Sequence, residues 1–398
     1  MSSESRNRYL LKNTLIFTLG NIGSRMISFF LIPLYTNVLT TSQYGTVDLI
    51  TTISTVAGPM LTLNIAESVM RFGLDKDADK EKNTQCGSIV LLIAMIIGLV
   101  LIPICRCITE VSDYAMYVYF YVISLSASQL FLCDLRGKEL LLKYSLGNIL
   151  QTLMIAILNI TFLLVFKMET GGYLLAYIIA NFIVAIYAII AGKGYKAFSF
   201  HNIDRCKLKE MIRYSVVLIP NTFMWWIMNS SDRVMVTYMI GAAANGIYAV
   251  SYKLPTLVST LTGIFNQAWS YSAIREEGTR DETEYNNKMF KTLSAIAFMM
   301  GIGLLLLTKP FLRVYVADSY YDAWKYTPFL IVGCVYLTLG TFMATSYTVH
   351  KDSFGYLFSG SFGAVFNILL NFILIPVIGV YGAALATILG LVLSFSMG

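Results

Sequence analysis

Long apolar segments alternate with short polar links along the whole chain. A helix needs about 20 largely apolar residues to cross a bilayer, and twelve segments meet this requirement. They occupy residues 12–39, 45–70, 86–105, 114–134, 144–166, 172–192, 211–240, 244–274, 288–308, 326–349, 354–377 and 381–398. Helix-breaking residues fall in the links, as at Gly171-Gly172 and Lys309-Pro310. The pattern predicts an all-α polytopic membrane protein with about twelve transmembrane helices.

The composition leads to the same class. Of the 398 residues, 57% are hydrophobic and only 13% are charged, whereas a soluble domain carries about 25% charged residues. This deficit excludes a water-soluble globular domain and a disordered chain. The net charge of +6 would suit a nucleic-acid binder, but no run of five basic residues exists. We therefore expect membrane lipid, and no nucleic acid, as the surroundings of this chain.

The basic residues predict the orientation in the membrane. Of the 29 Lys and Arg residues, 21 lie at the termini and in the links on one side, and 5 lie on the other. Because cytoplasmic loops carry the excess of Lys and Arg, both termini and the 193–213 link are expected in the cytoplasm. The polar start leads directly into the first span, so no cleavable signal peptide is expected.

A weak repeat runs through the apolar sequence. Asn159 with Gly172 echoes Asn371 with Gly382, and Tyr44-Gly45 echoes Asn245-Gly246, at offsets between 201 and 213 residues. Such offsets span six helices, so they predict two parallel six-helix bundles, residues 1–205 and 206–398, with a substrate pathway at the seam between them. Chance similarity among small residues in membrane helices is the alternative.

Several motifs together resemble a known family. They are Asn21-Ile-Gly-Ser-Arg25, Pro33-Leu-Tyr35, Tyr44-Gly-Thr-Val-Asp48, Asp232-Arg233, Gly246-Ile-Tyr248, Tyr252-Lys253, and Asn371 followed by Gly379-Val-Tyr-Gly382. In order and spacing the sequence resembles the Wzx-type oligosaccharide/polysaccharide flippases of the multidrug/oligosaccharidyl-lipid/polysaccharide (MOP) exporter superfamily. Many relatives continue to fourteen helices, whereas this chain ends at Gly398. We therefore expect a truncated member or an incomplete product.

The resemblance implies a MATE-like MOP fold and a lipid-linked substrate. Such flippases move undecaprenyl-diphosphate-linked oligosaccharide across the bacterial cytoplasmic (inner) membrane by alternating access, for O-antigen, capsule or exopolysaccharide assembly. The resemblance also implies glycosyltransferases and a polysaccharide polymerase as partners. We expect the protein to be a monomer. The alternatives are a cation-coupled multidrug exporter of the MATE type, another lipid-precursor flippase, and a membrane enzyme or polymerase acting on the same glycolipids.

Three cations lie inside the predicted spans, away from the span ends: Arg25, Arg233 and Lys253. A charge in the bilayer costs at least about 2.5–3.5 kcal/mol, so each needs a partner or a water-filled cavity. Arg25 lies about 17 Å into its span at 1.5 Å per residue, too deep to reach the interface easily. We interpret the three as candidate diphosphate ligands, because guanidinium and ammonium groups bind phosphate; ion pairs with neighbouring helices are the alternative.

Two carboxylates within or at the start of predicted spans could form ion pairs with these cations. Asp232 adjoins Arg233 and could neutralise Lys253, and Asp48 falls in the expected first turn of the second span, where the helix N-terminus favours an anion. Asp48 and Asp232 are therefore candidate coupling or pairing groups. Glu67 precedes Arg71 by four residues and is expected to form an ordinary helical ion pair.

No motif of an enzyme is present. The sequence has no phosphate-binding Walker loop, nucleophile elbow or zinc signature, and its six Cys and two His residues show no metal-ligand spacing. We therefore expect a transporter that needs no cofactor or metal, driven by an ion gradient, the membrane potential or removal of its product.

Overall fold

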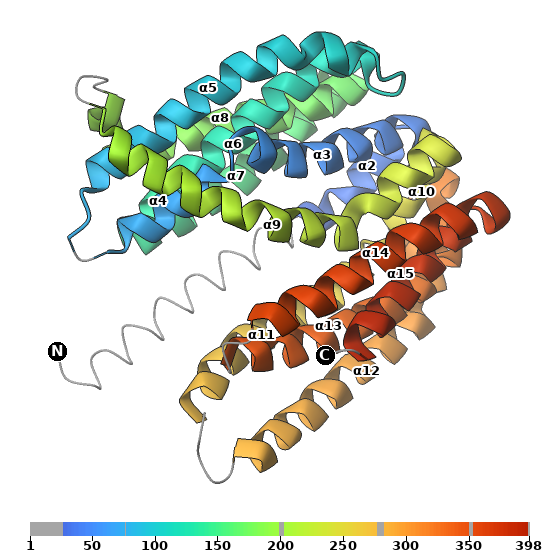
Figure 1. The fold of residues 1–398 in the computed structure, drawn as a ribbon. Coiled ribbons are helices and arrows are strands. Elements are labelled where there is room, and N and C mark those ends of the chain that lie inside the picture. Colours follow the sequence, from blue (N-terminus) through green and yellow to red (C-terminus); the bar gives the residue numbers. More distant parts are fainter. Residues whose placement is uncertain (1–26, 76, 199–202, 277–281, 350–352, 397–398) are drawn as a thin grey trace. The chain divides into compact units, whose positions relative to one another are not determined.

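The computed structural model describes residues 27–75, 77–198, 203–276, 282–349 and 353–396. All regular elements in these ranges are helices (Figure 1), which confirms the predicted all-α class. The chain forms two compact units. Unit 1 holds Ile50–Thr222 with the described end of Met1–Leu34, and unit 2 holds Tyr35–Leu49 with the described part of Phe223–Gly398. The proposed repeat halves, 1–205 and 206–398, stay a prediction.

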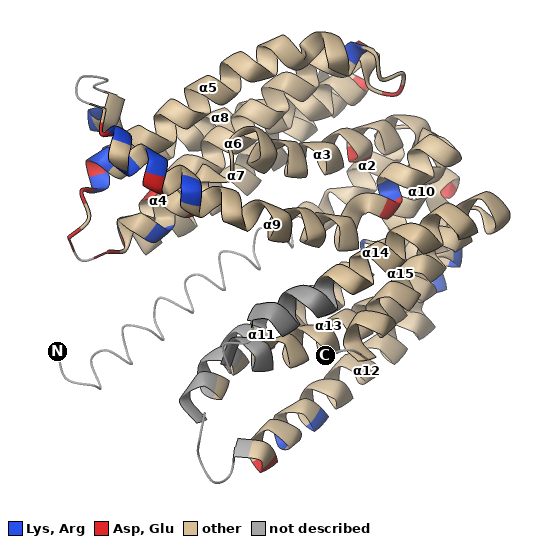
Figure 2. Cartoon of the chain, viewed as in Figure 1, with Lys and Arg blue, Asp and Glu red and all other residues tan. Residues whose placement is uncertain are grey.

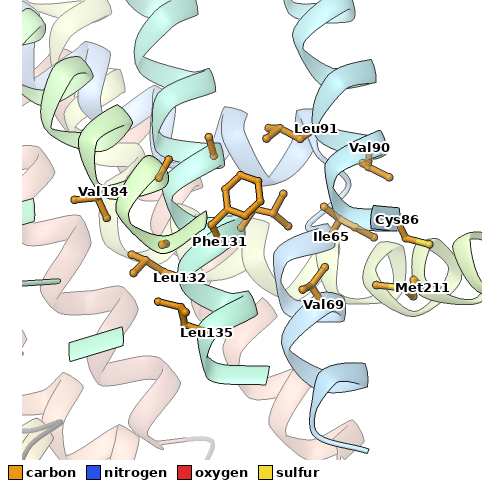
Figure 3. Packing of buried hydrophobic residues seen from close by; sticks show 14 residues of the cluster. Ile65, Val69, Cys86, Val90, Leu91, Phe131, Leu132, Leu135, Val184 and Met211 are labelled. Carbon is orange, nitrogen blue, oxygen red and sulfur yellow. The ribbon is translucent and has the colours of Figure 1, made fainter. Parts of the chain in front are cut away.

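Unit 1 is built from helices around one apolar core. It contains the later part of α3 (Thr41–Leu61), α4 (Ile65–Gly73), α5 (Lys80–Arg106), η1 (Ser112–Tyr114), α6 (Ala115–Gly137), α7 (Leu141–Ile160), η2 (Thr161–Val165), α8 (Glu169–Ala191), η3 (Gly194–Phe198) and the first part of α9 (Arg205–Met239). Ile65, Val90, Phe131, Leu135 and Met211 meet in the core, one or two from each of four helices (Figure 3).

Unit 2 begins with a short piece from early in the chain. This piece covers the end of α2 (Ile32–Val38) and the first turns of α3. The rest comprises the later part of α9, α10 (Ala242–Ser251), α11 (Pro255–Glu276), α12 (Glu282–Tyr315), η4 (Asp318–Lys325), α13 (Thr327–Val349), α14 (Ser353–Ile378) and α15 (Val380–Ser396). Its core includes Val236, Tyr248, Leu330, Ile375 and Ala383.

Most helices coincide in place with the predicted spans, although α9 and α12 begin about six residues earlier than predicted and α12 also ends seven residues later. Within the described ranges, seven helices are long and apolar enough to cross a membrane, or eight if the bent pair α3 and α4 counts as one span. The predicted total of twelve is consistent with this number. On α5, Ile96 and Val100 expose most of their side chains, as expected of a lipid-facing surface, and the charged residues of unit 1 gather mainly at helix ends and links (Figure 2).

Two predicted spans are interrupted. Between α3 and α4 the backbone of Leu63 and Asn64 is left-handed, with φ of 51° and 54°, and the two helices are bent by 60°. Between α10 and α11 the break follows from Pro255, which has no N–H to donate to the carbonyl of Ser251 four residues earlier. The hydroxyl of Thr327 in α13 reaches that carbonyl at 3.2 Å and shares its single proton with the carbonyl of Ala323 at 2.9 Å.

Candidate functional site

A buried polar cluster lies in unit 2, where α3, α9 and α10 meet. Arg233 of α9 donates from Nη1 to Oδ1 of Asp48 in α3 at 3.3 Å. Asn245 of α10 donates from Nδ2 to Oδ2 of Asp48 at 3.4 Å and to the carbonyl of Gly45 at 3.0 Å. One carboxylate therefore joins three helices.

The position of Asp48 differs from the expectation. Helix α3 begins at Thr41, four residues before the predicted start, so Asp48 lies two turns inside the helix and the N-terminus does not explain it. The helix starts early because Thr40 and Gln43 form a capping box: Gln43 N–H donates to Thr40 Oγ1, and Thr40 N–H donates to Gln43 Oε1.

Asp232 lies beside this pair and is surrounded by hydroxyl donors. Its Oδ2 accepts from Tyr248 at 2.7 Å, from Tyr252, and from Thr387 of α15 at 3.1 Å. Its Oδ1 accepts from the backbone N–H of Arg233. A buried carboxylate is stabilised by such donors, so Asp232 is held by neutral groups, and the predicted neutralisation of Lys253 by Asp232 is not seen.

The two cations of this cluster, Arg233 and Lys253, keep donors that carboxylates do not fill. Arg233 stacks on the ring of Tyr252, with Cζ 4.6 Å from the ring centre, and within the described residues its buried Nε has no hydrogen-bond partner. Lys253 lies in the break before Pro255 and is partly buried; among the described residues no carboxylate reaches ion-pair distance of its ammonium. Both positions lie within predicted spans, 211–240 and 244–274, where unfilled donor capacity favours an anion.

Close helix contact brings the cluster together. Helices α3 and α10 cross at Gly45 and Gly246, where a Cβ on Gly45 would come within 1.8 Å of the Ala242 carbonyl oxygen and a Cβ on Gly246 within 2.0 Å of that of Thr41. Small residues permit such approach between membrane helices. The crossing places Asn245 beside Asp48.

The predicted site residues are therefore distributed as follows. Asp48, Asp232, Arg233 and Lys253 lie close together in unit 2, and Arg25 lies outside the described residues. Sequence reasoning assigned no role to Asn245, Tyr248, Tyr252 or Thr387, although Tyr248 and Tyr252 stand four residues apart, on one helical face. No group of three or more His, Cys, Asp or Glu residues that could hold a metal ion occurs in the described part of the chain.

The arrangement of helices resembles that of solved transporters. A multidrug resistance MATE family transporter of the MOP superfamily, in an inward-facing conformation, matches with a TM-score of 0.75 and 12% identity over 94% of this chain and 93% of that chain. The lipid II flippase MurJ, in an inward closed conformation, matches with a TM-score of 0.69 and 13% identity over 96% and 86%. A MOP superfamily transporter from Pyrococcus furiosus is described as having a binding pocket of reverse polarity. It matches with a TM-score of 0.61 and 14% identity over 97% of this chain and 94% of that chain.

These likenesses show that the chain has the MATE-like fold, as predicted, and its long apolar helices are those of a multi-pass membrane protein. A family model described as polysaccharide biosynthesis protein matches residues 10–271. The chain belongs to this polysaccharide biosynthesis family, in agreement with the family resemblance predicted from the sequence. No curated protein matches the chain.

Proposed function

We propose that the protein is a flippase that moves undecaprenyl-diphosphate-linked oligosaccharide across the cytoplasmic membrane by alternating access. It would serve surface polysaccharide biosynthesis, as in the assembly of O-antigen, capsule or exopolysaccharide. Membership of the polysaccharide biosynthesis family supports the class of substrate. The observation that carries the proposal is the unfilled donor capacity of Lys253 and Arg233, which lie close together in unit 2 within two of the predicted spans.

The lipid diphosphate supplies the anion that these donors lack. A guanidinium fork and an ammonium group bind phosphate oxygens strongly where water is scarce. Arg233 is held by Asp48 and Tyr252, and Lys253 by the helix break, so both are positioned before the substrate arrives. We assign Arg25 the same role on the depth of its position in the sequence.

The test is translocation by the purified protein in vesicles that contain a fluorescent polyprenyl-diphosphate-linked N-acetylglucosamine. Lys253→Gln should lower the rate at least about tenfold, the effect of losing about 1.4 kcal/mol of binding, whereas Lys253→Arg should keep most of it. The matched control is Lys325→Gln, because Lys325 lies in η4 outside the spans, paired with Asp322 at 2.9 Å. Arg25→Ala should abolish surface polysaccharide in cells at unchanged protein abundance, and Arg25→Lys should restore part of it.

Two results contradict the proposal. One is a full translocation rate in Lys253→Gln. The other is a wild-type protein that moves no lipid-linked sugar but accumulates ethidium, which would instead identify a multidrug exporter of the MATE type.

We further propose that the protein resides in the bacterial inner membrane as a monomer, with both termini in the cytoplasm, and works beside glycosyltransferases and a polymerase. Single cysteines at Phe198 in η3 and at Asp318 in η4 should react with a membrane-impermeant maleimide from opposite sides. Labelling of both from one side would overturn this topology.

A further inference from the structure

Unit 1 contains a second polar feature, a half-open cavity of about 780 Å³ lined by the end of α3, the link to α4, α4 itself, α6, α7 and the first part of α9. Ligand pockets for molecules of up to a few rings have volumes of about 300–1,000 Å³, so a short oligosaccharide fits. The polar lining of the cavity includes Glu67, Gln129, Asn148, Gln151, Asn221 and Thr222.

The polar lining follows from helical spacing. On α7, Tyr144, Asn148 and Gln151 recur every three or four residues and face the cavity, whereas Leu142 and Leu146 on the same helix are exposed elsewhere. Polar side chains within membrane-spanning segments turn toward protein or water-filled space. The spacing of polar residues on α7 therefore accounts for this part of the polar lining.

The lining of this cavity differs in charge from the polar cluster in unit 2. Among its lining residues Glu67 carries the only charge. The expected pair of Glu67 with Arg71 is not formed, because Arg71 pairs with Asp75 at 2.7 Å. Arg136 contacts the ring of Tyr144 but does not line the cavity. A site without a cation does not suit a diphosphate.

The amides of the lining suit hydroxyl groups. A carboxamide offers both donors and acceptors, and a sugar hydroxyl is likewise both. Asn64 donates to Thr222 at 3.3 Å and Gln151 to Asn181 at 2.7 Å, whereas the described part of the chain gives the amides of Gln129 and Asn221 no partner. Two amides facing an internal space are thus available to a neutral polar ligand.

We infer that this cavity binds the saccharide portion of the lipid-linked substrate. The inference rests on the proposed function for the identity of the substrate and adds a site for its sugars, apart from the cations assigned to the diphosphate. Gln129 and Asn221 donate to and accept from sugar hydroxyls, and the rings of Tyr144 and Tyr214, which also line the cavity, contact the apolar faces of the sugars.

The experiment compares two probes in vesicles: fluorescent polyprenyl-diphosphate N-acetylglucosamine, and the same lipid carrying two further hexoses. For the wild type, KM for the trisaccharide should be at least tenfold lower than for the monosaccharide. Gln129→Leu and Asn221→Leu should each raise KM for the trisaccharide about tenfold and leave KM for the monosaccharide within twofold. Neither change breaks a hydrogen bond of the described chain, so we expect both variants to fold, and their abundance in the membrane checks this.

The control is Val217→Leu, which places a leucine one turn before Asn221 on α9, outside the lining, and should change neither KM. Equal KM values of the wild type for the two probes, or equal effects of Asn221→Leu on both, overturn the inference while leaving the proposed function intact. Inhibition of the wild type by ethidium that Glu67→Gln removes would show a cation pocket and also overturn it. Failure to move either probe refutes the proposed function itself.

Discussion

The ion pair between Asp48 and Arg233 gives the sharpest prediction of stability. At 3.3 Å, the attraction of two unit charges amounts to about 5 kcal/mol with an effective dielectric constant of about 20. Bringing each ion out of water costs several kcal/mol, but breaking such a pair from one side typically costs about 3–5 kcal/mol, because the remaining charge stays buried. The side chain of Asp232, which accepts from the backbone N–H of Arg233, stays beside the guanidinium, so we expect Asp48→Asn to lower the free energy of unfolding by the lower end of this range, about 3 kcal/mol.

Asp48→Asn removes the negative charge but keeps an oxygen that can accept a hydrogen bond. The new amide can still accept a hydrogen bond from Asn245, so the expected loss comes from the missing carboxylate. In the double variant with Arg233→Gln, no unpaired guanidinium is left behind. The loss should therefore fall short of the sum of the single losses by at least about 1 kcal/mol, the usual mark of two residues in contact.

The measurement is unfolding of the purified protein by SDS in mixed micelles, followed by near-ultraviolet circular dichroism. The matched control is Asp75→Asn, which removes the partner of Arg71 from an exposed pair and should leave the transition unchanged. Equal stability of Asp48→Asn and the wild type, or additive losses in the double variant, would refute the reasoning.

Two further predictions concern packing and the helix break. Gly246→Ala should destabilise the protein by about 1–3 kcal/mol, because the new Cβ meets the backbone of Thr41; Gly303→Ala, with nothing within 4 Å of its Cβ, should cause no loss in the same titration. Thr327→Val should lower stability by about 1–2 kcal/mol by leaving the Ser251 carbonyl without its donor, and an unchanged transition would show that another group satisfies this carbonyl.

The fold was largely predictable because the bilayer imposes a length and an apolar composition on each span. These constraints are local, so segments such as 86–105 and 326–349 could be recognised without knowing their neighbours. The breaks were harder to predict. Pro255 was visible, but proline is tolerated inside many membrane helices, and the acceptor it frees is satisfied by Thr327, 76 residues away.

The candidate site was predictable in its residues and not in its pairing. A charge in a span is conspicuous, which identified Arg233 and Lys253, but hydropathy does not say which helices pack together. Asp48 and Arg233 are separated by 185 residues, and Tyr248 and Thr387 are ordinary in membrane helices. The early start of α3 was in fact signalled by Thr40 and Gln43, the two ends of a capping box.

The glycine crossing in unit 2 has the form of a symmetric contact. Gly45 meets Ala242, and Gly246 meets Thr41; adding the repeat offset of 201 residues turns Thr41 into Ala242 and Gly45 into Gly246. Each helix thus presents equivalent positions to the other, with glycine at one pair and Thr41 or Ala242 at the second, as in an isologous interface between identical subunits. Two copies of a half-length chain with a small residue at each of these positions could dimerise through this crossing, so the contact is what a duplicated and fused ancestral homodimer would retain.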